Sequence, residues 1–172
     1  MKKIISFLFI FTVFFPTIAF ARVTPSDIHK DKVEVFEAIL AKIPDANKRA
    51  QVEKADQMLY DINQLICSKF DGEVAKLTGI LEELKSRAGV NETVVAYGQG
   101  DTPLDSAAYW VNWAQEAVAY QKIADYTPLI SATNFINPLI SEQAQLKADL
   151  RGLAGKIIKA KGEVAKAIKY VQ

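Results

Sequence analysis

The stretch LKADLRGLAGKIIKAKGEVAKAIKYV, residues 146–171, decides the fold of this protein. Its apolar residues follow one another in alternating steps of four and three: Leu146, Leu150, Leu153, Ile157, Ala160, Val164, Ala167 and Val171. This spacing places all of them on one side of a helix, in the pattern of a coiled-coil seam. Five basic residues fall on the opposite side: Lys147, Arg151, Lys159, Lys166 and Lys169. We therefore expect a long C-terminal helix that packs along another helix.

A second apolar stripe runs through the middle of the chain with similar spacing. Its members are Val52, Ala55, Leu59, Ile62, Ile66, Phe70, Val74, Leu77, Leu81 and Leu84. Three successive steps of four between Ile62 and Val74 form a stutter, which locally relaxes a left-handed supercoil. Residues 70–72, FDG, are an alternative site for a break in this helix.

The ends of this second helix also have recognisable signals. Pro44-Asp45 ends a first helix and starts the second, and Gly89 is a residue type that favours the turn after a helix end. A helix from Asp45 to Ala88 is about 66 Å long at a rise of 1.5 Å per residue. Such a helix either projects beyond its neighbours or bends near Gly72.

Prolines mark further helix starts, because proline suits the first helical position when a Thr or Asn cap precedes it. Four such pairs predict helix starts at Thr24, Thr102, Thr127 and Asn137. The first helix carries apolar residues at helical spacing from Pro25 to Ile43. Residues 89–101 lack helical character and are expected to form a loop, in which 93–97 could pair as a short strand.

Together these patterns predict an all-α fold: an elongated antiparallel helical bundle of three to four main helices with coiled-coil-like seams. Residues 22–172 are expected to form one domain, with a loop at 89–101 and a kinked or broken segment at 127–137. About 150 residues are enough to bury a single core.

The letters GEVAK occur twice, at 72–76 and 162–166. In both copies the valine belongs to the apolar stripe and the glycine lies on the opposite face. Glycine inside a helix costs about 1 kcal/mol relative to alanine, so its presence needs a reason. Either another backbone approaches closely at these glycines, or an exposed helix tolerates them. We interpret the repeat as two helices that reached the same pattern independently. An ancient duplication remains the alternative.

The N-terminal residues have the pattern of a bacterial Sec signal peptide. Lys2 and Lys3 precede an uncharged apolar run, and the segment ends in the small-residue pattern of a cleavage site. Residues 1–21 are therefore expected to be removed by cleavage between Ala21 and Arg22. The protein would then be periplasmic or extracellular, with an uncleaved membrane anchor as the alternative. Membrane contact is expected only during export, apart from a weak surface contact by the basic C-terminal helix.

The net charge and the lack of known catalytic and metal-binding motifs argue against several classes of function. Without Lys2 and Lys3 the 21 basic residues become 19, against 20 acidic ones, so net charge gives no case for nucleic acid as a partner. His29 is the only histidine, and no zinc, di-iron, haem, P-loop or dinucleotide motif occurs. We therefore predict no metal, no cofactor and no catalytic residues, and so no enzyme.

The candidate interaction residues lie in the third helix, in SAAYWVNWAQEAVAYQ, residues 106–121. They are the aromatic residues Tyr109, Trp110, Trp113 and Tyr120. Such a stripe can hold a glycan, a partner helix or a lipid interface. Because aromatic stripes at helical spacing usually face a core, and alanines flank these, the pattern favours a core role.

Cys67 is the only cysteine, so it cannot form a disulfide within its own chain. Its place beside the second apolar stripe predicts a half-buried, inert thiol. An intermolecular disulfide is the alternative in an oxidising compartment.

Three functional hypotheses follow from the sequence. The first is an exported, non-enzymatic interaction protein that binds another protein, or its own copy, through helical faces. The second is a binding module for an apolar or glycan ligand that uses the aromatic stripe. The third is a carboxylate-based enzyme that uses a residue such as Glu116, which the missing catalytic parts disfavour.

Overall fold

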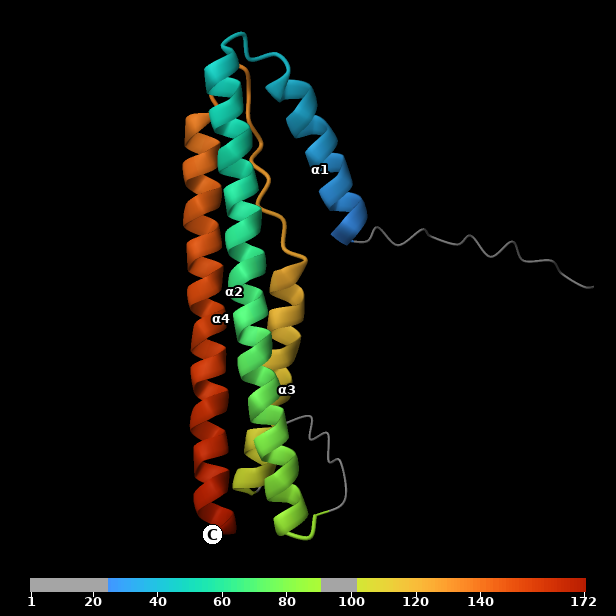
Figure 1. Ribbon diagram of the computed structural model, residues 1–172, viewed down its shortest axis with the longest axis vertical. Helices are drawn as coiled ribbons and strands as arrows, with labels where there is room; N and C mark the ends of the chain where they lie inside the picture. The colour runs from blue at the N-terminus through green and yellow to red at the C-terminus, as the bar shows by residue number, and fades with distance from the viewer. Residues whose placement is uncertain (1–24, 91–101) are drawn as a thin grey trace, which may run out of the picture.

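The computed structural model describes residues 25–90 and 102–172 and contains four helices. These are α1 (Pro25–Leu40), α2 (Ala46–Arg87), α3 (Pro103–Lys122) and α4 (Ile136–Val171). No strand occurs in these two ranges, and the all-α bundle is confirmed (Figure 1). The predicted signal segment with its cleavage site, the cap at Thr24 and the strand at 93–97 lie outside the described residues. Among the described helices, none is long and apolar enough to cross a membrane.

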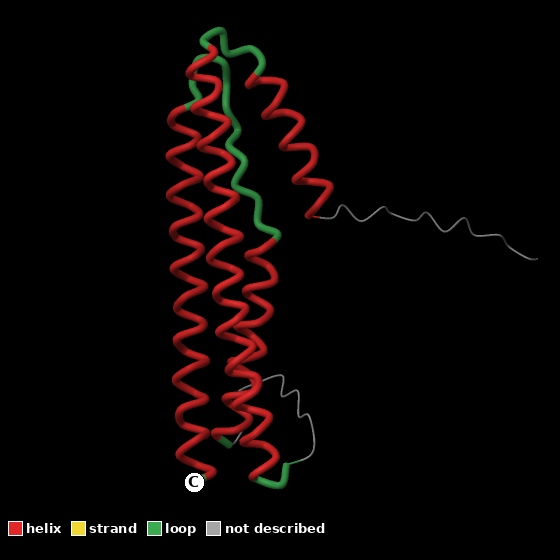
Figure 2. The backbone as a smooth tube through the Cα atoms, in the orientation of Figure 1, coloured by secondary structure: helices red, strands yellow, loops and turns green. Residues whose placement is uncertain are grey.

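The two long helices, α2 and α4, run side by side in the same direction (Figure 1). The shorter α3 runs the opposite way beside one half of this pair. Residues 123–135 continue in α3's direction as an extended segment beside the other half (Figure 2). Helix α1 lies at the far end and diverges from the bundle. Because other segments lie along both halves of α2, this helix does not project beyond its neighbours.

The main core lies where α2, α3 and α4 meet. Its buried members are Cys67, Val74, Leu77, Leu81, Leu84, Leu104, Ala107, Val111, Ala114, Val118, Leu153, Ile157, Ala160, Val164 and Ala167. All the α4 members belong to the seam that the sequence predicted, so that seam is confirmed. The four alanines have no exposed surface, which lets the helices approach closely. The core therefore combines large and small side chains that interlock.

The predicted stripe of α2 is wrong over one turn. Ile62 is exposed, whereas Asn63 and Cys67 are buried. A stutter leaves two adjacent stripes as possible core faces. The end of α3 decides between them, because Asn63 Nδ2 donates a hydrogen bond to the carbonyl of Gln121 at 2.9 Å. The Gln121 carbonyl, in the last turn of α3, also accepts from the backbone N–H of Ala124 at 3.2 Å, so Asn63 is a second donor to it.

Three predicted helix boundaries are confirmed by their hydrogen bonds. Thr102 and Asp105 form a capping box at the start of α3. The Asp45 side chain accepts hydrogen bonds from two backbone N–H groups of α2's first turn. At the other end Gly89 has a φ of 69°, and the N–H of Val90 donates to the Lys85 carbonyl at 3.0 Å. This is the Schellman ending for which glycine is suited. Between these ends α2 is continuous, so the alternative break at 70–72 is wrong.

The predicted helix start at Thr127 is wrong and two other boundaries are shifted, although the break near residues 127–137 is confirmed. Thr127 starts no helix, because residues 124–135 are extended or turned. The Asp125 carboxylate accepts from the backbone N–H of Thr127 at 2.9 Å, a local bond that competes with helix formation. Asn137 is already inside α4, whose first residue is Ile136 and whose cap makes no side-chain hydrogen bond. The first helix ends at Leu40, three residues before the predicted Ile43.

The two GEVAK segments lie at the same level of the parallel pair α2 and α4. Lys161, just before the second copy, pairs with Glu73 of the first, with 2.7 Å between Nζ and Oε2. Both valines, Val74 and Val164, belong to the main core. A Cβ added at Gly72 or Gly162 would meet nothing within 4 Å, so no other part of the described chain approaches them. Within residues 25–90 and 102–172 the close-approach explanation is therefore wrong, and both glycines are exposed.

Candidate functional site

The predicted core role is wrong for Trp113 and Tyr120 and holds in part for Trp110, which packs against the edge of the main core. Trp113 is 37% exposed and Tyr120 is 72% exposed, while Tyr109 and Trp110 are half-buried. The core face of α3 consists instead of smaller residues: Leu104, Ala107, Val111, Ala114 and Val118. These fit the narrow space between α2 and α4, whereas a row of large rings would push the helices apart.

Three of the four aromatic side chains form one cluster. The rings of Tyr109 and Trp110 have centroids 5.4 Å apart and are nearly perpendicular. Trp110 and Trp113 are 4.8 Å apart in a similar edge-to-face arrangement. Both geometries are favourable for aromatic pairs. Tyr120 makes no ring contact with them in the described chain, so the structure separates it from the predicted group.

Two lysines of α4 complete this surface. Lys156 Nζ lies 4.8 Å from the ring centroid of Trp113, and Lys159 Nζ lies 5.2 Å from that of Trp110. Both distances allow cation–π attraction. We call Tyr109, Trp110, Trp113, Lys156 and Lys159 the aromatic–lysine surface. The sequence placed Lys159 on the outer face of α4 but did not single out Lys156, whose only signal is its i, i+3 spacing from Lys159.

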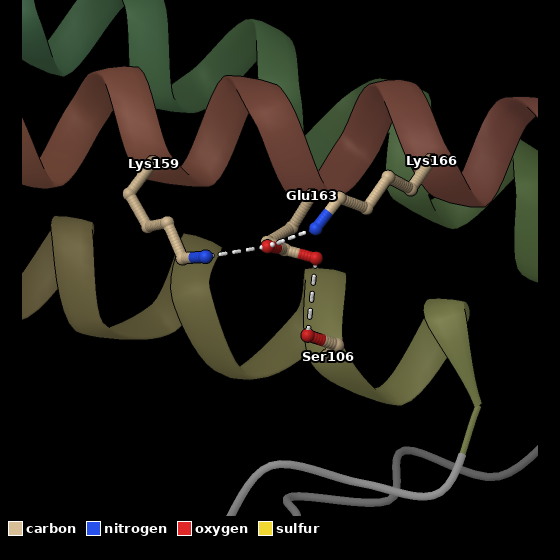
Figure 3. Close-up of polar contacts among 4 residues, drawn as sticks. All are labelled: Ser106, Lys159, Glu163 and Lys166. Atoms are coloured by element: carbon tan, nitrogen blue, oxygen red, sulfur yellow. Dashed lines mark hydrogen bonds and ion pairs between the residues drawn. The ribbon is translucent and has the colours of Figure 1, made fainter.

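Glu163 binds Lys159 of the aromatic–lysine surface, and Figure 3 shows its contacts with Ser106, Lys159 and Lys166. Its carboxylate is buried, and its Oε1 accepts hydrogen bonds from Lys159 Nζ at 2.7 Å and Lys166 Nζ at 2.8 Å. From α3, the Ser106 hydroxyl donates to Oε2 at 3.3 Å. Glu163 therefore holds Lys159 in place while that lysine also faces the Trp110 ring. Glu163 was not predicted from the sequence, although the lysines four residues before it and three residues after it were a usable signal.

The lysine hydrogen bonds lower the pKa of Glu163 to about 2. Lys159 contributes most, followed by Lys166, and both outweigh the opposing effect of burial. A carboxylate with so low a pKa is ionised at neutral pH and is a weak proton acceptor, so it does not activate the Ser106 hydroxyl as a base would. The Glu163 carboxylate therefore orients the ammonium groups of Lys159 and Lys166, which is a structural role.

Replacing Glu163 with glutamine should reduce stability in a pH-dependent way. At pH 7 the free energy of unfolding should fall by about 1–2 kcal/mol, a figure discounted because both lysines are partly exposed. Since the folded pKa lies below the ordinary value, this contribution is present above pH 4.5 and is lost as the pH falls towards 2. Urea unfolding of both proteins at pH 7 and pH 3 measures the difference.

Glu82→Gln is the matched control, because Glu82 pairs with Lys85 on the exposed surface of α2 at 3.1 Å. Its effect should stay within about 0.5 kcal/mol at both pH values. Equal losses from the two variants at pH 7 would contradict an anchoring role for Glu163.

The other predicted residues lie apart from the aromatic–lysine surface. Cys67 is fully buried and donates to Asn63 Oδ1 at 3.6 Å, and burial raises the pKa of its thiol. An intermolecular disulfide at Cys67 would therefore require the core to open. Glu116 is exposed on α3. In the described ranges, no three His, Cys, Asp or Glu side chains gather as a metal site would need.

The basic face of α4 is divided between two roles. Lys159 and Lys166 are bound to Glu163, whereas Lys147, Arg151 and Lys169 are exposed.

Comparison of the chain with known protein families, with curated proteins and with solved structures gave no match. Its function is therefore inferred from its own residues.

Proposed function

We propose that this protein is exported and acts as a non-enzymatic helical interaction protein, which binds another protein or a second copy of itself through a helical face. The aromatic–lysine surface is the binding face. The observation that carries this proposal is the exposure of Trp113, which is 37% exposed beside the half-buried rings of Tyr109 and Trp110. The export part rests on the signal-peptide pattern of residues 1–21.

The chemistry of this surface suits a protein partner. Tryptophan and tyrosine are enriched among the residues that dominate binding energy at protein interfaces. Here they are prearranged, because Trp110 contacts both Tyr109 and Trp113 and faces Lys159, which Glu163 holds. A prearranged surface loses less side-chain entropy when a partner binds.

A glycan or apolar ligand is the second candidate, favoured by the high exposure of Tyr120. A sugar that stacked on the face of Trp113 beneath Lys156 would have to displace that ammonium group. A protein partner can instead pack around both side chains. The glycan alternative predicts that Trp113→Ala and Tyr120→Ala each weaken binding, while the protein proposal predicts this only for Trp113→Ala.

Trp113→Ala should separate binding from folding. Because Trp113 is partly exposed, the variant should lose only about 1 kcal/mol of unfolding free energy. Its affinity for the partner should fall at least about tenfold, as expected for a central interface tryptophan. The partner would be captured by crosslinking to the wild type in the producing cell, purified and titrated against both proteins. Native mass spectrometry of the mature chain tests the second copy as partner.

The control is Tyr170→Ala, which also removes an exposed aromatic side chain but lies near the end of α4. It should leave the affinity unchanged. Wild-type affinity in Trp113→Ala, or an unfolded Trp113→Ala protein, would overturn the assignment of this surface.

A further inference from the structure

A cavity of about 530 Å³ lies between α1, α2 and the end of α3. Its α1 wall includes Phe36 and Leu40, its α2 wall includes Tyr60, and Ile123 and Tyr126 follow the last turn of α3. This volume lies within the range of small-molecule sites, which occur between the helices of bundles. None of the residues of the aromatic–lysine surface lines it, so it is a separate feature of the molecule.

Among the described side chains, the buried apolar contacts between α1 and the bundle lie near the C-terminal end of α1. Phe36, Leu40 and Ile43 form a small core with Val52 and Ile130. Towards its N-terminus α1 diverges from α2 (Figure 1). The wall formed by the residues after α3 is fixed more firmly, because the Tyr126 hydroxyl donates a hydrogen bond to Asp149 Oδ2 at 2.8 Å. Burial raises the pKa of Tyr126 to about 12. Tyr126 is therefore neutral at pH 7 and adds no charge to the cavity.

Negative charge predominates at the cavity. Four carboxylates line it, against a single lysine, and they are Glu37, Glu53, Asp56 and Asp125. That lysine, Lys122, is bound to Asp71 outside the cavity. A second lysine, Lys32, pairs with Asp125 at 3.7 Å between Nζ and Oδ2. The ammonium groups of Lys32 and Lys122 are thus each paired with an aspartate.

Glu37 on α1 and Glu53 on α2 are the carboxylates that remain for a ligand. In the described part of the chain neither has an ion-pair partner, and both belong to the cavity wall. A cation that enters would gain a charge-assisted hydrogen bond from either group. Its apolar portion would cover Tyr60 and Ile123, which are 53% and 54% exposed, and remove them from water.

We propose that this cavity binds a small amphipathic organic cation, an ammonium group on an apolar body, with Glu37 and Glu53 as its charge partners. The apolar lining selects the body, and the excess of carboxylates selects the sign of the head group. An anion of the same shape would meet only repulsion and the lysines already bound to aspartates.

The test uses a matched pair of probes, 4-phenylbutylamine and 4-phenylbutyrate, which differ in the sign of their charge. Isothermal titration of the mature chain, residues 22–172, at pH 7 should show saturable binding of the amine. The carboxylate should bind at least about tenfold more weakly, the ratio for loss of one charge-assisted contact. The double variant Glu37→Gln/Glu53→Gln should weaken amine binding by about tenfold or more.

Glu82→Gln/Glu83→Gln is the control, because it removes the same charge from the far end of α2, outside the cavity. It should bind the amine as the wild type does. The proposal is overturned by equal binding of the two probes, by equal losses in the two double variants, or by no binding of the amine. The last result, together with binding of a lysine-containing amphipathic peptide, would assign the cavity to a protein segment instead.

Discussion

Replacing Asn63 with aspartate should destabilise the folded protein by about 3 kcal/mol at pH 7. Asn63 is 1% exposed and is bonded on both sides by Gln121. Its Nδ2 donates to the Gln121 carbonyl at 2.9 Å, and its Oδ1 accepts from Gln121 Nε2 at 2.9 Å. Asn63→Asp keeps the size of the side chain, but it replaces the donor with a negatively charged oxygen that faces a carbonyl. The change therefore introduces a buried charge without an adequate partner.

The loss in Asn63→Asp should depend on pH in a defined direction. Burial and the facing carbonyl raise the pKa of the introduced carboxyl above the ordinary value for aspartate, about 3.9. Its protonated form donates a hydrogen bond to the Gln121 carbonyl, as the amide does in the wild type. The difference in unfolding free energy should thus shrink as the pH falls through the raised pKa. Urea unfolding of variant and wild type between pH 4 and pH 8 measures it.

Asn112→Asp is the control for this experiment, because Asn112 is exposed on α3. Its effect should remain within about 0.5 kcal/mol and vary little with pH. A loss for Asn63→Asp that is equally small at pH 8 would contradict the buried contact between α2 and the end of α3.

Ile157→Ala is expected to lower the free energy of unfolding by about 3 kcal/mol, within the range for truncating a buried isoleucine. Ile157 is 1% exposed and lies in the main core beside residues of α2 and α3. The substitution removes buried apolar surface and leaves a cavity that rigid neighbouring helices fill only in part. Total stabilities are typically about 5–15 kcal/mol, so this one change removes a large fraction.

The next residue provides the matched control. Ile158 is 69% exposed, and Ile158→Ala makes the same chemical change one position further along α4. It should alter stability by about 0.5 kcal/mol or less, because alanine also favours the helix slightly. Thermal or urea unfolding of both variants measures the contrast. Similar losses at the two positions would show that the seam of α4 faces elsewhere.

The helix boundaries show which local signals could be read without the structure. Asp45, Thr102 and Gly89 act through hydrogen bonds and backbone angles within a few residues, so sequence predicted them correctly. Asn137 lies one residue after the start of α4 at Ile136, but Thr127 carries an equally good cap residue and starts no helix. There the extended segment is held by burial of Tyr126 and Ile130 and by the bond from Thr127 to Asp125. Non-local burial outweighed a local preference worth about 1 kcal/mol.

The candidate sites could be predicted only in part. The sequence selected Tyr109, Trp110 and Trp113, because aromatic residues on a helix are few and conspicuous. It assigned them to the core, since spacing alone does not show how closely neighbouring helices approach. Glu163, Lys156 and the cavity beneath α1 were not predicted. Each depends on residues from different helices, whose relative positions no local pattern specifies.

Sequence alone determined that the chain is helical, that α4 has one continuous apolar seam, where α2 begins and ends, and where α3 begins. These properties follow from spacing at the helical period and from caps that act locally. Tertiary structure alone decided that Asn63 is buried in place of Ile62 and that Trp113 of α3 lies outside the core. It also decided that α1 diverges to leave a cavity. The physical reason is that side-chain packing depends on the distances between helices, which the whole assembly of helices sets together.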